Sequence, residues 1–594
     1  MTTITDDKTF AKGGGFLLQE TPPERVFIPE EFTDEHRMIA HTTEEFVKNE
    51  VTPHLEEIEH QNLELVVDLL RKAGQLGLLA AGIPEKYGGL GLDKISLTLI
   101  MEKLAGVSSF SVSHGAHTGI GTEPLVYFGT EEQKRKYLPK LATGELLAAY
   151  ALTEPGSGSD ALGAKTRADL SPDGRHYILN GTKMWITNAG FADLFTVFAK
   201  VNGEQFTAFL VERTFPGFTV GREEKKMGIK GSSTCALNLD NVPVPVENVL
   251  GEIGKGHKIA FNSLNLGRLK LAAGCVGGCK VAFDHAVSYA KERHQFGRAI
   301  CEFGLIKHKL GEMVIRTWVN ESMVYRTTRM IDEALEGIDV DDMPAQMKAI
   351  EEYAIECAIN KVMASEALDY AVDEMVQIYG GYGYSQEYPA ERAYRDARIN
   401  RIFEGTNEIN RLLTTDMLLR RAVKGRLPLI PAARALKDEL LAGPSLQEDE
   451  DEWLGAEKRL LANSKKVALL IAGMAMQKYM EALAEEQEIV GDISDIVMDV
   501  YAMESALLRT LKLIAQRGPE ATSLQMDITR TYINDAVERI AARARRALAA
   551  IAEGDELRTY LGALRRLTRH TPINTVATRR RIADAMIEAG RYAL

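Results

Sequence analysis

The chain has 594 residues, too many for one hydrophobic core, and a length of this order predicts about three to five domains. Its 45% hydrophobic and 26% charged residues are typical of an ordinary globular protein, not of a disordered chain. The net charge of -13 argues against a general nucleic-acid binder, so an anionic substrate must be held by local basic groups and helix N-termini.

The N-terminal residues 1–15 are polar, partly acidic and then glycine-rich, unlike a secretory signal or an arginine-rich transit peptide. No stretch approaches 18 uninterrupted apolar residues, so we expect no membrane span. Five cysteines form an odd, sparse set that indicates free thiols in a reducing compartment. Cys275 and Cys279 lack a second pair of ligands, so we expect no metal site. These features favour a cytoplasmic protein, although a mature organellar protein would share them.

Residues 1–148 are predicted to form an N-terminal helical domain. Thr33 is a plausible N-cap, and apolar residues with helical spacing follow it. The segment 83–91 contains Pro84 and three glycines, which predicts a turn-rich loop between helices.

Residues 149–255 are predicted to form a middle β domain. The pattern around Asn180-Gly181 favours a hairpin, with strands at 176–179 and 182–187 joined by a two-residue turn. Apolar runs at 194–201 and 206–211 predict two further strands.

The helical period returns at residue 256 and continues almost to the C-terminus. Residues 256–425 are predicted to form a helical bundle, whose segment 259–293 is rich in small residues that suit close packing. Residues 426–452, with several prolines and the acidic run 448–452, are predicted to be a partly exposed connection. Residues 453–594 are predicted to form an appended helical domain. The fold class is therefore mainly α with an inserted β domain.

Two segments of the middle domain suggest a cofactor site. In Thr153-Glu154-Pro155-Gly156-Ser157-Gly158-Ser159-Asp160, glycines and serines allow backbone amides and hydroxyls to approach a polar ligand. The strand Trp185-Ile186-Thr187 follows, with an aromatic ring that could stack on a flat ligand. Taken singly, the first segment could be an ordinary turn and Trp185 a core residue.

Together with other motifs, these segments resemble the flavin-binding signature of the acyl-CoA dehydrogenase family. The resemblance covers roughly residues 33–423, in the family's order and spacing. The additional motifs are Pro84-Glu85-Lys86-Tyr87-Gly88-Gly89, Arg293-His294-Gln295-Phe296-Gly297, Gln377-Ile378-Tyr379-Gly380-Gly381 and Phe403-Glu404-Gly405-Thr406-Asn407.

The resemblance implies FAD as the cofactor and assigns each motif a part of it. Contacts to the flavin ring and the adjoining chain are implied for Leu152, Thr153, Gly158, Ser159, Trp185, Ile186 and Thr187. Contacts to the pyrophosphate and adenosine, across a dimer interface, are implied for Arg293, Phe296, Gln377, Gly380 and Gly381. Thr406, Asn407 and Glu408 are implied to reach FAD from the start of a helix, where Thr406 is a good N-cap and a helix N-terminus suits a phosphate.

Glu404 matches the family's catalytic base. Removing a proton α to a thioester requires a positioned base, and a carboxylate becomes stronger when the substrate excludes water from it. Some relatives carry the base directly before an arginine, but here Gly267 precedes Arg268, which leaves Glu404 unopposed. Ser159, Asn265, Arg268 and Gly405 are the expected substrate contacts, with a helix-pairing role for Arg268 as the alternative.

The appended domain resembles that of the very-long-chain branch of the family. The small residues of 113–121 are similar to its substrate-channel helix, although close helix packing is an alternative explanation. The implied activity is dehydrogenation of a long-chain fatty acyl-CoA to the trans-2-enoyl-CoA in β-oxidation, with electrons passed to an electron-transfer flavoprotein. The alternatives are an acyl-CoA oxidase that uses O2 and a relative with an assembly or scaffold role.

The resemblance also suggests how copies of the chain assemble. Shorter relatives pair dimers into tetramers, and a domain packed on their body would block the second pairing, so we expect a homodimer. The basic segments 539–546 and 579–581 could touch an anionic membrane weakly, but a solvated helix face is the commoner meaning.

Overall fold

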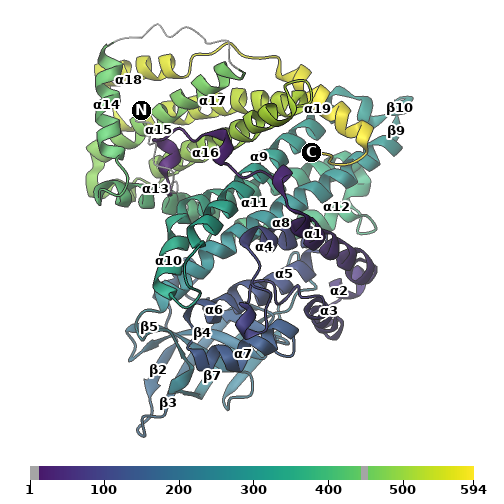
Figure 1. Ribbon diagram of the computed structural model, residues 1–594, viewed down its shortest axis with the longest axis vertical. Helices are drawn as coiled ribbons and strands as arrows, with labels where there is room; N and C mark the ends of the chain where they lie inside the picture. Colours follow the sequence, from purple (N-terminus) through teal and green to yellow (C-terminus); the bar gives the residue numbers. More distant parts are fainter. Residues whose placement is uncertain (1–11, 443–452) are drawn as a thin grey trace.

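A computed structural model describes residues 12–442 and 453–594 of the chain. Three layers follow one another along the longest axis of the molecule (Figure 1). The β domain lies at one end together with N-terminal helices, the helical bundle is central, and the appended helices cover the other end. The expected fold class, mainly α with an inserted β domain, is confirmed.

The N-terminal domain contains seven α-helices within the described residues. Thr33 caps the first of them, because its Oγ1 accepts a hydrogen bond from the His36 amide at 3.2 Å, as predicted. The expected loop at 83–91 contains one 3-10 turn, Glu85–Tyr87. The helices are α1 (Asp34–Phe46), α2 (Leu55–Glu59), α3 (Leu63–Gln75), α4 (Lys94–Lys103), α5 (Ser108–Ala116), α6 (Glu123–Phe128) and α7 (Glu131–Thr143).

The middle domain is built on one mixed, mainly antiparallel sheet with the order β6-β7-β3-β2-β4-β5-β8, and β1 pairs with β4. Strand β4 is buried on both faces: Phe198 belongs to one hydrophobic cluster and Phe195 to another. This double burial explains its continuous apolar sequence. The strands are β1 (Ala148–Ala151), β2 (Arg167–Leu170), β3 (His176–Thr187), β4 (Leu194–Val201), β5 (Gln205–Glu212), β6 (Phe218–Glu223), β7 (Thr234–Pro245) and β8 (Val249–Leu250).

The predicted hairpin at Asn180-Gly181 is wrong. Residues 176–187 form the single strand β3, which pairs along its length with β7 and shifts register between Leu179 and Gly181. A Cβ on Gly181 would lie 2.5 Å from Thr166 Oγ1, so this glycine serves a close backbone approach at a bulge.

The central bundle consists mainly of four long helices, and α8 packs most extensively against α11. The small residues of α8 also allow close packing on α4, because a Cβ on Gly277 would collide with the carbonyl group of Glu102. A small two-stranded hairpin, β9 (His294–Gln295) and β10 (Arg298–Ala299), follows α8. The helices are α8 (Gly256–Glu292), α9 (Gly304–Leu335), α10 (Met343–Glu352), α11 (Ala354–Tyr379), α12 (Pro389–Ala397) and α13 (Asn407–Val423).

The appended domain shares one hydrophobic core with the bundle. Helix α16 is its centre and packs against α15 and α17 on one side and against α9 and α13 on the other. Part of the predicted connection is helical, since α14 lies within it and packs on α15, whereas the acidic run 448–452 lies outside the described residues. The helices are α14 (Leu429–Ala442), α15 (Gly455–Tyr479), α16 (Gln487–Arg517), α17 (Ser523–Ile551), α18 (Gly554–Leu567) and α19 (Thr575–Ala589).

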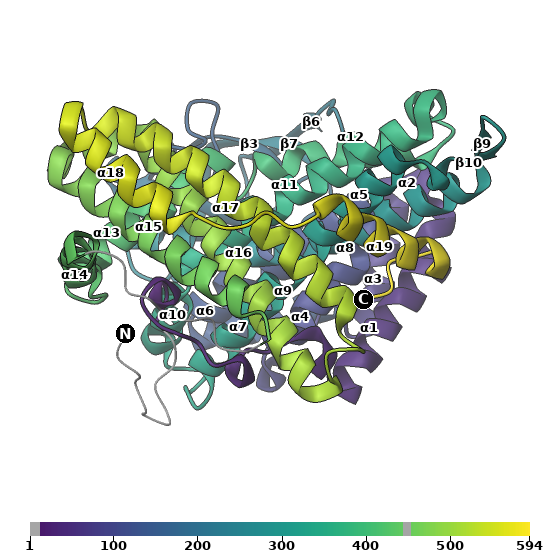
Figure 2. The same cartoon turned by 90° about the horizontal axis from the view of Figure 1, so that it is seen from above.

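The N-terminal segment before α1 runs along the appended domain (Figures 1 and 2). The ring of Phe16 lies 4.8 Å from that of Tyr501, and Arg509 donates to Glu30 at 2.8 Å. The N-terminal segment and the appended domain, which are far apart in the sequence, therefore contact each other on the same face of the bundle.

The segment Gly455–Glu485, which contains α15, is long and apolar enough to be a candidate membrane span. Length and composition alone are weak evidence, since the core helices of soluble proteins pass the same test. Helix α15 packs against both α16 and α17, and Val467, Ile471 and Ala475 are fully buried there. We interpret α15 as a bundle helix.

Candidate active site

A long cavity lies between the N-terminal helices and the bundle, with about 1550 Å³ of empty space including its open mouth. Helix α5 and the π-helical turn His117–Gly121 form one wall, and α8, α11 and α12 contribute others. Gly267, Gly274 and Gly278 of α8 line it, the first two about two turns apart and the last two about one turn apart. Residues of the predicted channel helix 113–121, including Gly115 and Gly119, also face this space.

Glu404 lines the same cavity from the loop before α13. Its backbone has a φ of +59°, a strained value for a residue with a side chain. The carboxylate lies directly over Gly267, where an added Cβ would be 2.7 Å from Glu404 Oε2. Gly267 thus leaves the space that the carboxylate occupies.

Burial raises the pKa of Glu404 to about 7, while the positive charges of Arg268 and Lys361 act in the opposite direction. Its Oε2 atom is buried without a hydrogen-bond partner in the described structure. A carboxyl group with a pKa near neutrality and a free buried oxygen is suited to accept a proton from a bound molecule.

Two of the predicted substrate-binding residues support the Glu404 loop. Arg268 is buried and donates from Nε to the Glu404 carbonyl oxygen at 3.1 Å. Asn265 Oδ1 accepts from the same guanidinium at 3.0 Å and holds it in place. Contacts of these two side chains with a substrate stay a prediction.

Lys361 and Asn410 are functional candidates that the sequence reasoning missed. Lys361 Nζ donates to the Gly405 carbonyl oxygen at 2.8 Å and to Asn407 Oδ1 at 2.7 Å, and burial lowers its pKa to about 8. Asn410 Nδ2 donates to the Gly405 carbonyl oxygen at 2.8 Å. A lone lysine within the apolar stretch of α11 was the available signal for Lys361.

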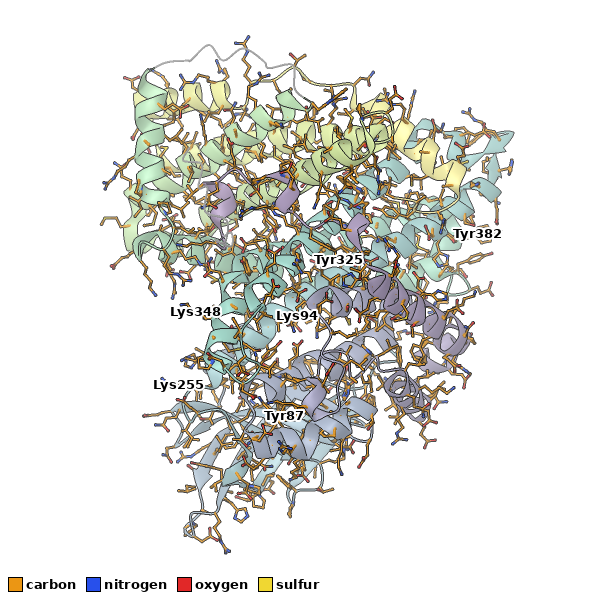
Figure 3. The ribbon with its side chains drawn as sticks, in the orientation of Figure 1. Tyr87, Lys94, Lys255, Tyr325, Lys348 and Tyr382 are labelled. Atoms are coloured by element: carbon orange, nitrogen blue, oxygen red, sulfur yellow. The ribbon has the colours of Figure 1, made fainter. Side chains whose placement is uncertain are left out.

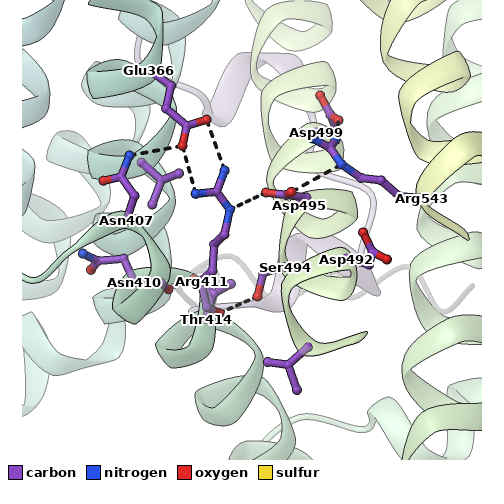
Figure 4. A network of polar contacts seen from close by, with 12 residues as sticks. Glu366, Asn407, Asn410, Arg411, Thr414, Asp492, Ser494, Asp495, Asp499 and Arg543 are labelled. Atoms are coloured by element: carbon purple, nitrogen blue, oxygen red, sulfur yellow. Dashed lines mark hydrogen bonds and ion pairs between the residues drawn. The ribbon is translucent and has the colours of Figure 1, made fainter. Parts of the chain in front are cut away.

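The first turn of α13 presents the three predicted FAD contacts Thr406, Asn407 and Glu408. Thr406 caps the helix by accepting a hydrogen bond from the Ile409 amide at 3.2 Å, as predicted. The Asn407 side chain instead points into a polar network, where its Nδ2 atom donates to Glu366 at 3.1 Å (Figure 4). Glu408 is exposed, and hydrogen bonding to its own backbone amide lowers its pKa.

The glycine- and serine-containing loop follows β1 and rests on a buried ion pair. Lys183 Nζ lies 2.8 Å from Glu154 Oε1 and donates to the Leu152 carbonyl oxygen at 3.1 Å. Thr153 is partly buried beside them, whereas Gly158 and Ser159 are exposed. The ion pair, which the sequence reasoning did not identify, fixes the base of the loop and leaves its tip open.

Trp185 and Thr187 lie at the end of β3 nearest the cavity. Trp185 has a φ of +62° at a register shift, and 53% of its surface is exposed. Thr187 lines the cavity, and Ile186 between them is buried in the sheet. The strand therefore turns an aromatic face outward where the sequence predicted a stacking platform.

The remaining predicted cofactor residues form a separate group at the far end of the bundle. Figure 1 shows the hairpin β9–β10 at the opposite end of the bundle from the β domain, and Tyr382, labelled in Figure 3, marks this end. The Arg293 guanidinium lies 5.6 Å from the centre of the Tyr382 ring. All members of the group are exposed: Arg293, Phe296, Gln377, Gly380 and Gly381.

Models of one protein family match most of the described chain. Models described as acyl-CoA dehydrogenase N-terminal, middle and C-terminal domains match residues 33–145, 149–242 and 254–419. A second acyl-CoA dehydrogenase C-terminal domain matches residues 463–566, within the appended domain.

Individual relatives give the same result. A probable acyl-CoA dehydrogenase of Bacillus subtilis (strain 168) is 53% identical over 98% of both chains. The mitochondrial very long-chain specific acyl-CoA dehydrogenase of Rattus norvegicus is 37% identical over 77% of this chain and 72% of its own. The crystal structure of an acyl-CoA dehydrogenase complexed with FAD from Bacillus anthracis has a TM-score of 0.97 at 53% identity, covering 98% of this chain and 100% of that one. The chain belongs to the acyl-CoA dehydrogenase family.

Proposed function

We propose that this protein is an FAD-dependent dehydrogenase that converts long-chain fatty acyl-CoA to trans-2-enoyl-CoA in β-oxidation and passes electrons to an electron-transfer flavoprotein. The observation that carries the proposal is the Glu404 carboxylate, which faces a long cavity with a buried, unpartnered oxygen and a pKa raised to about 7.

The residues around the cavity fit FAD. Trp185 offers an exposed ring face beside Thr187, and no atom lies within 4 Å of a Cβ built on Gly158, so a ligand can approach the loop backbone. At the other end of the bundle, Gly380 and Gly381 are equally open. FAD, when bound, supplies the acceptor for the hydride that leaves the substrate β-carbon.

Glu404 is the general base in this proposal. Its carboxylate takes the α-proton of the thioester, and the proton remains on the carboxyl group until product leaves. Arg268, Lys361 and Asn410 hold the loop so that the carboxylate keeps its place over Gly267. A bound acyl chain excludes water from the cavity and strengthens the base further.

The shape of the cavity supports the preference for long chains. The cavity follows α8 from Gly267 to His285, which is about 27 Å at a rise of about 1.5 Å per residue. A zigzag of single bonds of about 1.5 Å at angles near 111° advances about 1.25 Å per carbon, so this length accommodates a long fatty chain.

The two separate groups of cofactor residues support a homo-oligomer. One group lies at the β domain and the other beside β9–β10, at the opposite end of the bundle. A second copy of the chain would bring its own far end to the flavin site, which completes the cofactor contacts across an interface.

The test is anaerobic mixing of the purified yellow protein with palmitoyl-CoA while the flavin spectrum is recorded. Wild-type protein should be bleached rapidly, and Glu404→Gln should be slower by about 10²–10⁴-fold with its FAD retained. Glu538→Gln, which changes an exposed carboxylate of α17, is the matched control and should behave as wild type.

Absence of bleaching in the wild type, or a Glu404→Gln rate above about a tenth of the wild-type rate, would overturn the assignment. Reoxidation then identifies the acceptor. Rapid recovery in air alone would favour an oxidase over a dehydrogenase that needs an electron-transfer flavoprotein.

A further inference from the structure

A polar network joins the appended domain to the first turn of α13 (Figure 4). Arg411 of α13 is its centre. The Arg411 guanidinium donates from Nε to Asp495 of α16 at 2.7 Å, and its NH1 atom lies 2.9 Å from Glu366 of α11. One arginine thus holds carboxylates from two different domains.

A continuous series of hydrogen bonds connects this network to the loop that carries Glu404. Glu366 Oε1 accepts from Asn407 Nδ2 at 3.1 Å, and Asn407 Oδ1 accepts from Lys361 Nζ at 2.7 Å. Lys361 in turn donates to the carbonyl oxygen of Gly405, the residue after Glu404, at 2.8 Å. Asp495 is therefore connected to the Glu404 loop through four side chains.

Asp495 is itself fixed within the appended domain. Arg543 of α17 lies 3.3 Å from Asp495 Oδ2 and also pairs with Asp499 at 2.7 Å. Beside this pair, the Thr415 and Ser494 hydroxyls of α13 and α16 are 2.7 Å apart. The Arg411 and Asp495 side chains are only 19% and 18% exposed, so their pairing is less screened than a surface ion pair.

The loop at the other end of the network needs such support. Glu404 has a left-handed backbone, which persists only where the surroundings hold it. If Asp495 lost its charge, Arg411 would keep Glu366 as its carboxylate partner and could shift towards it. Glu366 also accepts the Asn407 hydrogen bond, so such a shift would reach Asn407 and Lys361.

We propose that Asp495 is a positioning residue for catalysis, and that one role of the appended domain is to hold the loop carrying Glu404 through Arg411, Glu366, Asn407 and Lys361. This role rests on the proposed function only as far as it concerns the reaction rate. The effect on the loop itself is independent of the substrate.

The test compares Asp495→Asn with Asp492→Asn in the full-length protein with FAD bound. Asp492 lies one turn earlier on α16 and is also paired with an arginine of α17, Arg546, but its described partners do not include α13. Both variants remove one charge from the same helix. Asp495→Glu keeps the charge and serves as the rescue variant.

We expect Asp495→Asn to slow flavin reduction at saturating palmitoyl-CoA by about 3- to 30-fold while the Kd for the acyl-CoA changes little. Amide hydrogen exchange of residues 404–408 should be faster in this variant, measured by mass spectrometry without substrate. Asp492→Asn should keep the wild-type rate and exchange at 404–408 even if its thermal stability falls, and Asp495→Glu should recover most of the rate.

Equal rates and equal exchange in Asp495→Asn and Asp492→Asn would overturn the inference. A wild-type protein that palmitoyl-CoA does not reduce would contradict the proposed function instead. In that case the exchange of residues 404–408 still decides whether Asp495 positions the loop.

Discussion

At the residue scale, the position of the proposed base depends on Glu404 and Gly267 together. The glycine before Arg268 does more than exclude a second base from that place, because any side chain there would occupy the space of the Glu404 carboxylate. The loop before α13 thus supplies the carboxylate, and α8 supplies the space that it occupies.

The raised pKa of Glu404 predicts a pH dependence of the reaction. Only the ionised carboxylate accepts a proton, so kcat/KM should be constant well above the pKa of about 7 and fall about tenfold per pH unit well below it. Steady-state assays with palmitoyl-CoA at varied pH measure this profile. Activity that stays level down to about pH 5 would show that the base has an ordinary pKa.

The same pKa predicts that the base costs stability. A carboxyl whose pKa rises from 4.5 to about 7 on folding binds its proton more tightly in the native state, so stability falls as pH rises through this window. Glu404→Gln should therefore be more stable than wild type above pH 7, by on the order of 3 kcal/mol, with the difference vanishing near pH 4.5. Thermal unfolding of both proteins at several pH values is the measurement, and a difference independent of pH would contradict the explanation.

Lys270, which lines the cavity near Glu404, is paired with Glu123. Lys270 lines the cavity one turn beyond Gly267, and its ammonium lies 2.6 Å from Glu123 Oε1, with both side chains largely buried. Glu123 therefore holds a positive charge that could otherwise pair with the Glu404 carboxylate and weaken it as a base.

Removing Glu123 alone should release this lysine. We expect Glu123→Gln to lower kcat/KM about tenfold and to move the acidic limb of its pH profile to lower pH. Glu123→Gln/Lys270→Met should restore both, since the freed charge is then absent. A double variant as slow as the single one would mean that the pair serves only the packing of α6 on α8.

At the element scale, strand β3 shows how a local signal is overruled. Asn180-Gly181 is a typical hairpin turn by sequence, but β7 pairs with β3 on both sides of it, and the pairing with β2 reaches Asn180. The glycine is needed because Thr166, directly before β2, occupies the place of a side chain at residue 181.

Gly181→Ala should therefore destabilise the protein by about 1–3 kcal/mol through overpacking and strain at this bulge. The control is Gly491→Ala on α16, where nothing lies within 4 Å of the added Cβ, and the helix should gain up to about 1 kcal/mol. Differential scanning calorimetry compares the two, and a Gly181→Ala protein as stable as wild type would contradict the packing argument.

At the scale of the whole molecule, the basic segments of the appended domain serve internal pairing. Arg539 and Arg543 both bind Asp499 at 2.7 Å, and Arg581 binds Asp527 at 2.7 Å. These charges are neutralised within the helical layer, which reduces what they could offer an anionic membrane.

We predict a homodimer of about 131 kDa, twice the mass of the 65.6 kDa chain. The appended domain covers one side of the bundle, the surface on which we expect shorter relatives to pair further (Figure 2). Light scattering would detect a tetramer of about twice the dimer mass, which would contradict this occlusion.

Truncation after Val423 should give aggregation, because the shared core of α9, α13 and α16 would be opened.

The sequence by itself determined the layered order of helical, β and helical parts and the caps at Thr33 and Thr406, and it led to the proposal of Glu404 as the base. These features depend on periodicity, on capping chemistry within a few residues and on motifs of fixed spacing, all of which are local properties of the chain. The five linked motifs together identified the family, whereas each motif alone was ambiguous.

Only the tertiary structure decided how the active-site loop is held. Lys361 and Asn410 lie on different helices, and Asp495 comes from a third that the sequence places well beyond the catalytic motif. The same is true of Gly181, whose neighbour Thr166 lies in the segment just before β2. A side chain's partner across space is set by helix packing and sheet register, and no periodic pattern in one segment encodes the segment that it meets.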